Sequence, residues 1–114
     1  MNSIKLKKIS ANIAREVSAI IMNEARDGIL KSITITSAEG TNDLSFAKIY
    51  FTSILDIDKK SLEKEVNEAS SFIRGFLSKN IELRHTPELR FIYDESIEYG
   101  QKIDSIIKNI HEEK

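Results

Sequence analysis

Few side chains in this sequence have the reactivity that catalysis needs. The chain has no cysteine, and only His85 and His111 offer imidazole groups. With no thiol and no glycine-rich phosphate loop, the sequence supports neither a nucleophile with its base nor a nucleotide site. Asp94 and Glu95 adjoin, but the strand period turns neighbouring side chains to opposite faces, which makes them a poor acid–base pair. We therefore predict no catalytic residue and no enzyme activity.

An Asp-x-Asp pair is the one feature that suggests a metal ion. Asp56 and Asp58 could share a divalent cation, yet no further carboxylate lies close by in sequence to complete an oxygen shell. They come just before an apolar helical pattern that begins at Leu62, where an Asp can accept hydrogen bonds from the free amides of a helix. We interpret the pair as a loop with a helix cap, and we predict no metal and no cofactor.

A basic edge lies near the start of the chain. Lys5, Lys8, Asn12 and Arg15 are spaced by three or four residues, so they share one face of a helix. Such a face is ordinarily solvated surface. The 17 Lys and Arg against 18 Asp and Glu give a net charge of -1, so overall basicity does not argue for a nucleic-acid partner. Only the distribution of the cations could do so.

The elements that would carry these residues follow from hydrophobic periodicity. An apolar stripe at helical spacing predicts a first helix from Ile4 to Arg26, which ends at Asp27 with Gly28 in the left-handed conformation. Alternating residues predict strands over 32–36 and 47–52. The segment 40–43 between them is rich in turn formers, so we expect an antiparallel hairpin.

The segment from Leu62 to Asp94 reads as helix, kink, helix, loop and strand. Its helical stripe consists of Leu62, Val66, Ala69, Ile73, Phe76, Leu77 and Ile81. We place the kink at Ala69, Ser70 and Ser71. In the strand, Leu89, Phe91 and Tyr93 alternate with Arg90, Ile92 and Asp94. A helical crossover of this length usually joins parallel strands, so the third strand should pair with the second and leave the helices on one face.

The whole pattern predicts one α+β domain over residues 1–114. It is a two-layer sandwich of order α-β-β-α-(kink)-α-β with a three-stranded mixed sheet. Phe51, Phe76 and Phe91 should meet in its core. A short C-terminal helix should begin near Ser96 and pack through Ile103, Ile106, Ile107 and Ile110. The composition is 40% hydrophobic and 31% charged, and neither a bilayer-spanning run nor a secretory signal is present, so we expect a cytoplasmic protein.

Four stretches closely resemble the ribosome-binding factor A family of bacteria. They are Ala69-Ser70-Ser71-Phe72-Ile73-Arg74, Leu83-Arg84-x-x-Pro87-Glu88-Leu89-x-Phe91, Tyr93-Asp94-x-Ser96 and Asp43-Leu44-x-x-Ala47-Lys48-Ile49-Tyr50. The resemblance extends from about Lys5 to Ile107. It implies a type II KH-like fold and an assembly factor that binds free 30S particles, promotes maturation of the 5′ end of 16S rRNA and supports growth in the cold.

Two departures from the family pattern affect the expected geometry. The kink commonly reads Ala-x-Gly, whereas Ser71 stands here in place of the glycine, so the freedom of a glycine backbone is missing. The N-terminal arginines of the family correspond to Lys5 and Lys8, which keep the charge but lack the planar fork that grips phosphate in two places.

The resemblance also indicates where RNA would bind. KH domains clamp single strands with a Gly-x-x-Gly loop, which this chain lacks, so we expect recognition of folded RNA by shape and charge. The candidate contacts are Lys5, Lys7, Lys8, Arg15, Arg74, Lys79, Arg84 and His85. Some of these are expected to be plain surface residues, because exposed cations and ion pairs contribute little.

We expect one partner, the small ribosomal subunit with its 16S rRNA, and neither a membrane nor a small-molecule substrate. The protein should act as a monomer. The alternative is a KH-like adaptor that binds protein without touching RNA, through the open sheet face formed by Lys48, Tyr50, Thr52, Arg90 and Ile92. The two functions differ in salt response, because phosphate binding weakens steeply with salt and an apolar interface does not.

Overall fold

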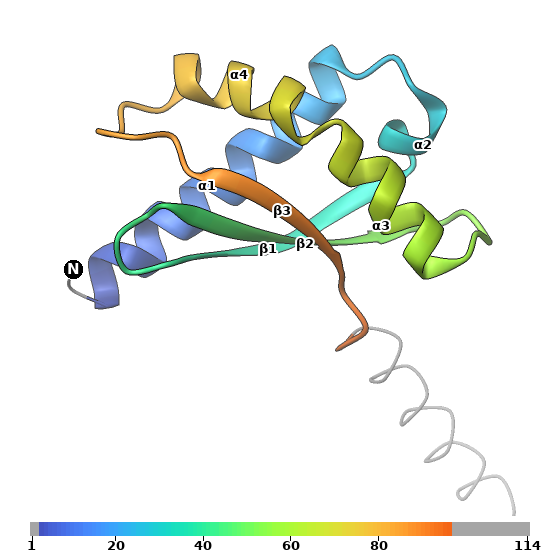
Figure 1. Ribbon diagram of the computed structural model, residues 1–114, viewed down its shortest axis with the longest axis horizontal. Coiled ribbons are helices and arrows are strands. Elements are labelled where there is room, and N and C mark those ends of the chain that lie inside the picture. The colour runs from blue at the N-terminus through green and yellow to red at the C-terminus, as the bar shows by residue number, and fades with distance from the viewer. Residues whose placement is uncertain (1–2, 97–114) are drawn as a thin grey trace, which may run out of the picture.

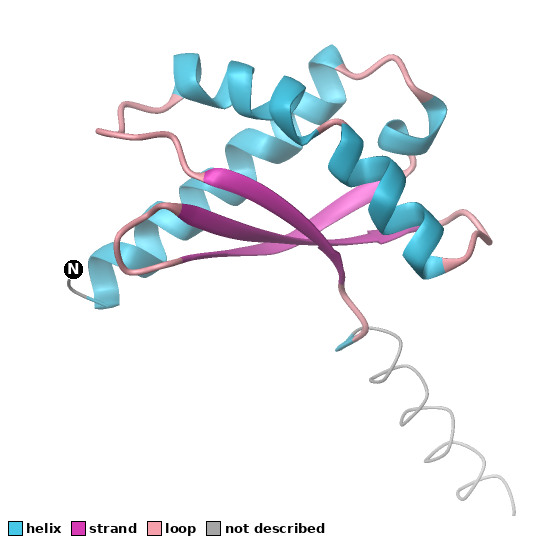
Figure 2. Ribbon diagram, in the orientation of Figure 1, coloured by secondary structure: helices cyan, strands magenta, loops and turns pink. Residues whose placement is uncertain are grey.

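The computed structural model describes residues 3–96 and has helices on one face of a single sheet (Figure 1). The elements in chain order are α1 (Ser3–Glu24), α2 (Gly28–Lys31), β1 (Ile33–Gly40), β2 (Phe46–Ser53), α3 (Lys59–Glu68), α4 (Ser70–Asn80) and β3 (Glu88–Tyr93). Figure 2 shows the two layers, with the helices gathered on one side of the strands. This confirms the predicted α+β order. The predicted C-terminal helix lies outside the described residues.

The sheet has the predicted topology. Its strand order is β1-β2-β3, with β2 antiparallel to β1 and parallel to β3. Phe51 pairs with Ile35 on one side and with Tyr93 on the other. One feature was not predicted: the register shifts between Ile35 and Ser37, which leaves Thr36 as the extra residue of a β-bulge.

The hairpin turn lies slightly later than predicted. Gly40 still belongs to β1, where it pairs with Ala47, and the connection runs through residues 41–45. The Gly40 amide donates to the Ser10 hydroxyl of α1 over 3.0 Å. A Cβ at this position would lie 3.0 Å from a Leu44 methyl group and 3.4 Å from that hydroxyl. Glycine is therefore needed here for a close approach to α1 rather than for the turn.

The predicted end of the first helix was wrong. α1 ends at Glu24, and Gly28 opens the short helix α2 instead of closing α1 in a left-handed conformation. Within residues 3–96 no glycine has a positive φ. The physical reason is Asp27, whose carboxylate accepts a 2.8 Å hydrogen bond from the Ile29 amide and so caps the start of a new helical turn.

The predicted kink and the predicted cap are both present. α3 ends at Glu68 and α4 begins at Ser70, with Ala69 between them at φ -91° and ψ 1°. The Ile73 amide still donates to the Ala69 carbonyl over 3.0 Å, so the chain continues into α4 without a glycine. At the other end of α3, the Asp58 carboxylate accepts from the Ser61 amide over 3.1 Å.

The core lies between the sheet and the helices, and one member of the predicted aromatic trio is not part of it. Phe51 and Phe91 are buried and meet edge to face with ring centroids 6.5 Å apart. Phe76 is only half-buried, because Ile73 and Leu77 occupy the centre of the α4 stripe. The third aromatic ring beside Phe51 is instead that of Tyr93, with ring centroids 5.7 Å apart.

Candidate nucleic-acid interface

Positive charge is segregated on two neighbouring helices. The stretch from Ser3 to Arg15 of α1 contains four cations and no carboxylate, and the stretch from Ala69 to Ile81 contains Arg74 and Lys79 and no carboxylate. α1 and α4 pack against each other. The chain therefore has a basic region despite its net charge of -1, because its carboxylates lie elsewhere.

Lys5 and Arg84 face the same groove, although they are far apart in sequence. One wall of this basic groove is formed by Lys5, Ile9 and Asn12 of α1, and the other by the end of α4 and the following loop, residues 80–84. Its volume is about 530 Å³. One carboxylate, Glu82, also lines it. The tertiary structure thus joins the basic edge of α1 to the α4–β3 loop.

Arg84 also borders a second hollow on the far side of the loop. Two elements line this hollow. α4 contributes Ser71, Arg74, Gly75 and Ser78, and the loop contributes His85 and Thr86 besides Arg84. Arg84 and His85 are exposed. Four of the eight predicted contacts, Lys5, Arg74, Arg84 and His85, therefore lie around one loop.

Arg74 has an internal role that sequence reasoning missed. Its Nη2 donates to the Thr86 carbonyl over 2.7 Å, and its Nε donates to the Thr86 and Pro87 carbonyls, each over 3.2 Å. The guanidinium therefore holds the loop that carries Arg84 and His85. No local pattern signals this role, because the hydrogen bonds span 12 and 13 residues.

The other four predicted contacts lie in three different places. Lys8 and Arg15 are exposed, and their helical spacing puts them on the Lys5 side of α1. Arg15 also donates to the Asn12 side chain over 3.4 Å. Lys7 points the other way and lines a hollow between α1 and β1. Lys79 lies on the flank of α4 away from Arg74, with its Nζ 5.7 Å from the Phe76 ring centroid.

Comparison with known proteins places the chain in a family. The family model described as ribosome-binding factor A matches residues 5–107. The chain belongs to the ribosome-binding factor A family. The ribosome-binding factor A of Staphylococcus epidermidis is 41% identical over 113 residues, which cover 97% of each chain. That of Finegoldia magna is 37% identical and covers 99% of this chain and 96% of its own.

Solved structures with family names share the fold. The crystal structure of ribosome-binding factor A from Thermus thermophilus superposes with a TM-score of 0.68 at 17% identity, over 77% of this chain and 94% of that one. The solution structure of a putative ribosome-binding factor A from Thermotoga maritima gives a TM-score of 0.55 at 24% identity, over 77% and 82% of the two chains. These likenesses establish the architecture of the family for this chain.

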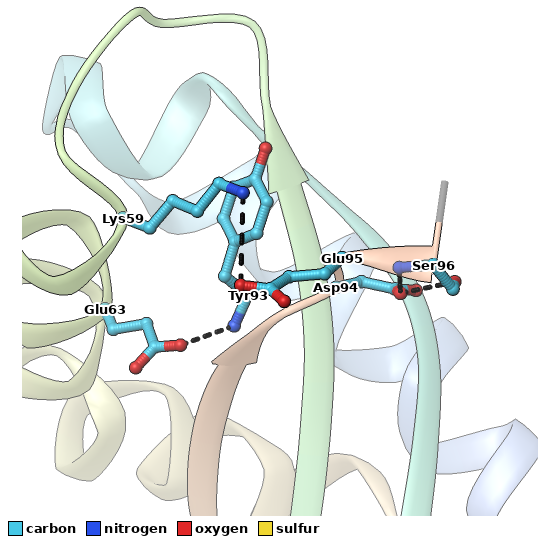
Figure 3. A network of polar contacts seen from close by, with 6 residues as sticks. All are labelled: Lys59, Glu63, Tyr93, Asp94, Glu95 and Ser96. Atoms are coloured by element: carbon cyan, nitrogen blue, oxygen red, sulfur yellow. Dashed lines mark hydrogen bonds and ion pairs between the residues drawn. The ribbon is translucent and has the colours of Figure 1, made fainter. Parts of the chain in front are cut away.

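The family-like stretch Tyr93-Asp94-x-Ser96 is a structural junction. The Asp94 carboxylate accepts from the Thr36 hydroxyl over 2.6 Å. It also accepts from the Ser96 amide and hydroxyl over 3.0 and 2.5 Å (Figure 3). The Ser96 and Thr36 side chains hold the pKa of Asp94 below its ordinary value. The bulge at Thr36 thereby links β1 to the end of β3, and Asp94 acts as a hydrogen-bond acceptor.

The residues beside Asp94 connect β3 to α3. The Tyr93 amide donates to the Glu63 carboxylate over 3.0 Å, and Lys59 forms an ion pair with Glu95 at 3.9 Å (Figure 3). The Lys59 Nζ also lies 5.2 Å from the Tyr93 ring centroid. No cluster of three or more potential metal ligands occurs within residues 3–96. None of the described helices is long and apolar enough to span a membrane.

The open sheet face carries charges of both signs. Lys48 lies between Glu39 of β1 and Arg90 of β3 in the sheet register. The Tyr50 hydroxyl donates to the Glu39 carboxylate over 3.3 Å, and desolvation, followed by the Glu39 charge, raises the pKa of Tyr50. This face therefore lacks the single-sign character of the α1 edge, which makes it the weaker surface for phosphate.

Proposed function

We propose that this protein is a ribosome assembly factor that binds the free 30S small ribosomal subunit through its 16S rRNA. The basic edge of α1 and the loop with Arg84 and His85 would meet the phosphates. The observation that carries this proposal is the basic groove, which Lys5 of α1 and Arg84 of the α4–β3 loop both line. A structural relative supports it: a homology model of the Thermus thermophilus factor has been fitted into a cryo-EM map of a 30S complex.

The chemistry available is positioning rather than bond breaking. Lysine ammonium groups and an arginine fork attract phosphates, and contacts of this kind set orientation without reading sequence. The protein would therefore favour one conformation of the RNA, on which nucleases then act during late maturation, including processing of the 5′ end of 16S rRNA. Cold stabilises misfolded RNA pairings, so this help would matter most for growth at low temperature. We place the activity in the cytoplasm and expect a monomer.

The roles of the eight candidates would then differ. Lys5, Lys8, Arg15, Arg84 and His85 would meet phosphate directly. Arg74 would position the loop. Lys79 would meet phosphate from the flank of α4 on the α1 side. Lys7, on the side of α1 that faces β1, would contribute least.

Charge reversal tests the proposed surface. Changing Lys5, Lys8 and Arg84 together to Glu should weaken binding to purified small subunits by roughly tenfold or more and flatten its salt dependence. The measurement is co-sedimentation across a salt series. Folding should survive, since surface substitutions usually change stability by about 0.5 kcal/mol or less each.

The matched control also reverses two lysines and one arginine. Arg26, Lys60 and Lys64 are exposed and lie outside the basic groove, whereas Lys59 is unsuitable because of its ion pair with Glu95. The control variant should bind like the parent protein. Equal losses from both variants would contradict the site. Binding that is indifferent to salt would instead favour the adaptor that uses the open sheet face.

A further inference from the structure

An exposed aromatic ring lies on the basic side of the molecule. Within residues 3–96 only two phenylalanine rings are about half exposed: Phe72 on α4, at 48%, and Phe46 on β2, at 50%. Phe72 is not part of the apolar stripe of α4, whose buried residues are Ile73 and Leu77. An apolar residue off the stripe of an amphipathic helix is the sequence signal that identifies this ring.

The Phe72 ring is held in place. It meets Phe76 edge to face, with centroids 5.1 Å apart and an interplanar angle of 77°. Phe76 is half-buried and packs against the core cluster, and the Lys79 Nζ lies over its ring. Edge-to-face pairs are favoured arrangements of aromatic rings, so Phe72 is preorganised on its helix.

Helix geometry turns this ring toward α1. Phe72, Phe76 and Lys79 are spaced by four and three residues and share one flank of α4. Arg74 and Ser78 occupy the opposite flank, which faces the α4–β3 loop. Arg74 holds the residues that lead into β3 at one edge of the sheet, whereas α1 packs on β1 at the other edge. The Phe72 flank, opposite Arg74, therefore lies on the α1 side of α4.

We infer that Phe72 is a stacking platform for an unpaired base of the bound RNA. The phosphates next to that base would meet Lys79 and the basic edge of α1. Aromatic side chains that stack on splayed bases, combined with cations along the backbone, are the usual way in which proteins bind unpaired nucleotides. This inference rests on the proposed function. The other proposed contacts recognise only the charge and shape of the RNA, whereas Phe72 would contact a base.

The surroundings of Phe72 favour a nucleotide over a partner helix. A helix-binding groove requires several exposed apolar residues in a row, whereas the exposed neighbours of Phe72 on α4 are Ser71, Gly75 and Lys79. α4 itself contains no carboxylate, and the exposed Glu68 at the end of α3 lies four residues before Phe72. The first carboxylate on α1 is Glu16. Phe46 differs, because an acidic residue, Glu88, is its direct partner in the sheet register.

The test compares matched substitutions of the two exposed rings. Phe72→Leu should weaken binding to purified small subunits by roughly tenfold, the usual effect of losing one stacked base, and leave the salt slope unchanged because no phosphate contact is lost. Phe72→Tyr should bind like the parent protein, since its ring can still stack. Phe46→Leu should have no effect. Circular dichroism and thermal unfolding verify that each variant is folded.

A fluorescent reporter identifies what touches the ring. The chain has no tryptophan, so Phe72→Trp introduces a single indole. On adding small subunits, its fluorescence should be quenched by the stacked base, while that of Phe46→Trp should not change. A brighter, blue-shifted signal would mean that protein covers the ring and would overturn the inference.

The outcomes separate this inference from the proposed function. If the parent protein binds in a salt-dependent way and Phe72→Leu binds equally well, the stacking platform is wrong and the basic surface stands. If reversal of Lys5, Lys8 and Arg84 has no effect on binding, the proposed surface fails, and the inference fails with it.

Discussion

At the scale of single residues, Arg74 shows that a cation in a predicted RNA site can act through its own protein. Its guanidinium donates to the carbonyls of Thr86 and Pro87, which arginine can do because its donors form a planar fork. Lysine cannot reproduce this geometry. Arg74→Lys should therefore loosen the loop by about 1 kcal/mol, seen as several-fold faster hydrogen exchange over residues 83–88 of the free protein. Lys79→Ala, on the other flank of α4, serves as the control and should leave that exchange unchanged. Equal exchange in the parent and Arg74→Lys would rule out the positioning role.

At the scale of elements, the kink between α3 and α4 forms without the glycine common in the family. Ala69 takes φ -91° and ψ 1°, a bridge-region conformation that does not require glycine, and Ser71 already lies within α4. Glycine has more conformational freedom to lose in a helix than serine has. Restoring the family residue with Ser71→Gly should therefore lower the free energy of unfolding by about 0.5 kcal/mol rather than raise it. Urea denaturation measures this change. A more stable Ser71→Gly protein would show that the kink is strained with serine present.

At the scale of the whole molecule, one core joins the parallel strand pair to all of the longer helices. Phe51 and Phe91 are 0% and 1% exposed, and the cavity left by truncation of either ring would lie between the layers. Phe91→Ala should reduce the free energy of unfolding by roughly 3 to 5 kcal/mol. Phe76→Ala should reduce it clearly less, because that half-buried ring also contacts solvent. Chemical denaturation of the two variants provides the comparison. Equal effects would mean that Phe76 belongs to the core after all.

The sequence alone was sufficient for the three longer helices, the three strands, the sheet order and the kink, but not for the short helix α2. Periods of two and 3.6 residues are properties of the local backbone. The sequence pattern therefore predicts that Phe91 of the strand and Ile73 of the helix are buried. A hairpin followed by a helical crossover leaves few topologies to consider. For the same reason, Asp58 could be recognised as a cap from its position before Leu62.

Only the tertiary structure determined which cations act together. Lys5 and Lys7 are two residues apart but face opposite sides of α1. The α4–β3 loop brings Arg84 to the groove lined by Lys5 and not to the hollow lined by Lys7. Whether Asp27 would cap a new helix depends likewise on where the chain turns after α1. These outcomes follow from packing between segments distant in sequence, and no local period encodes how such segments meet.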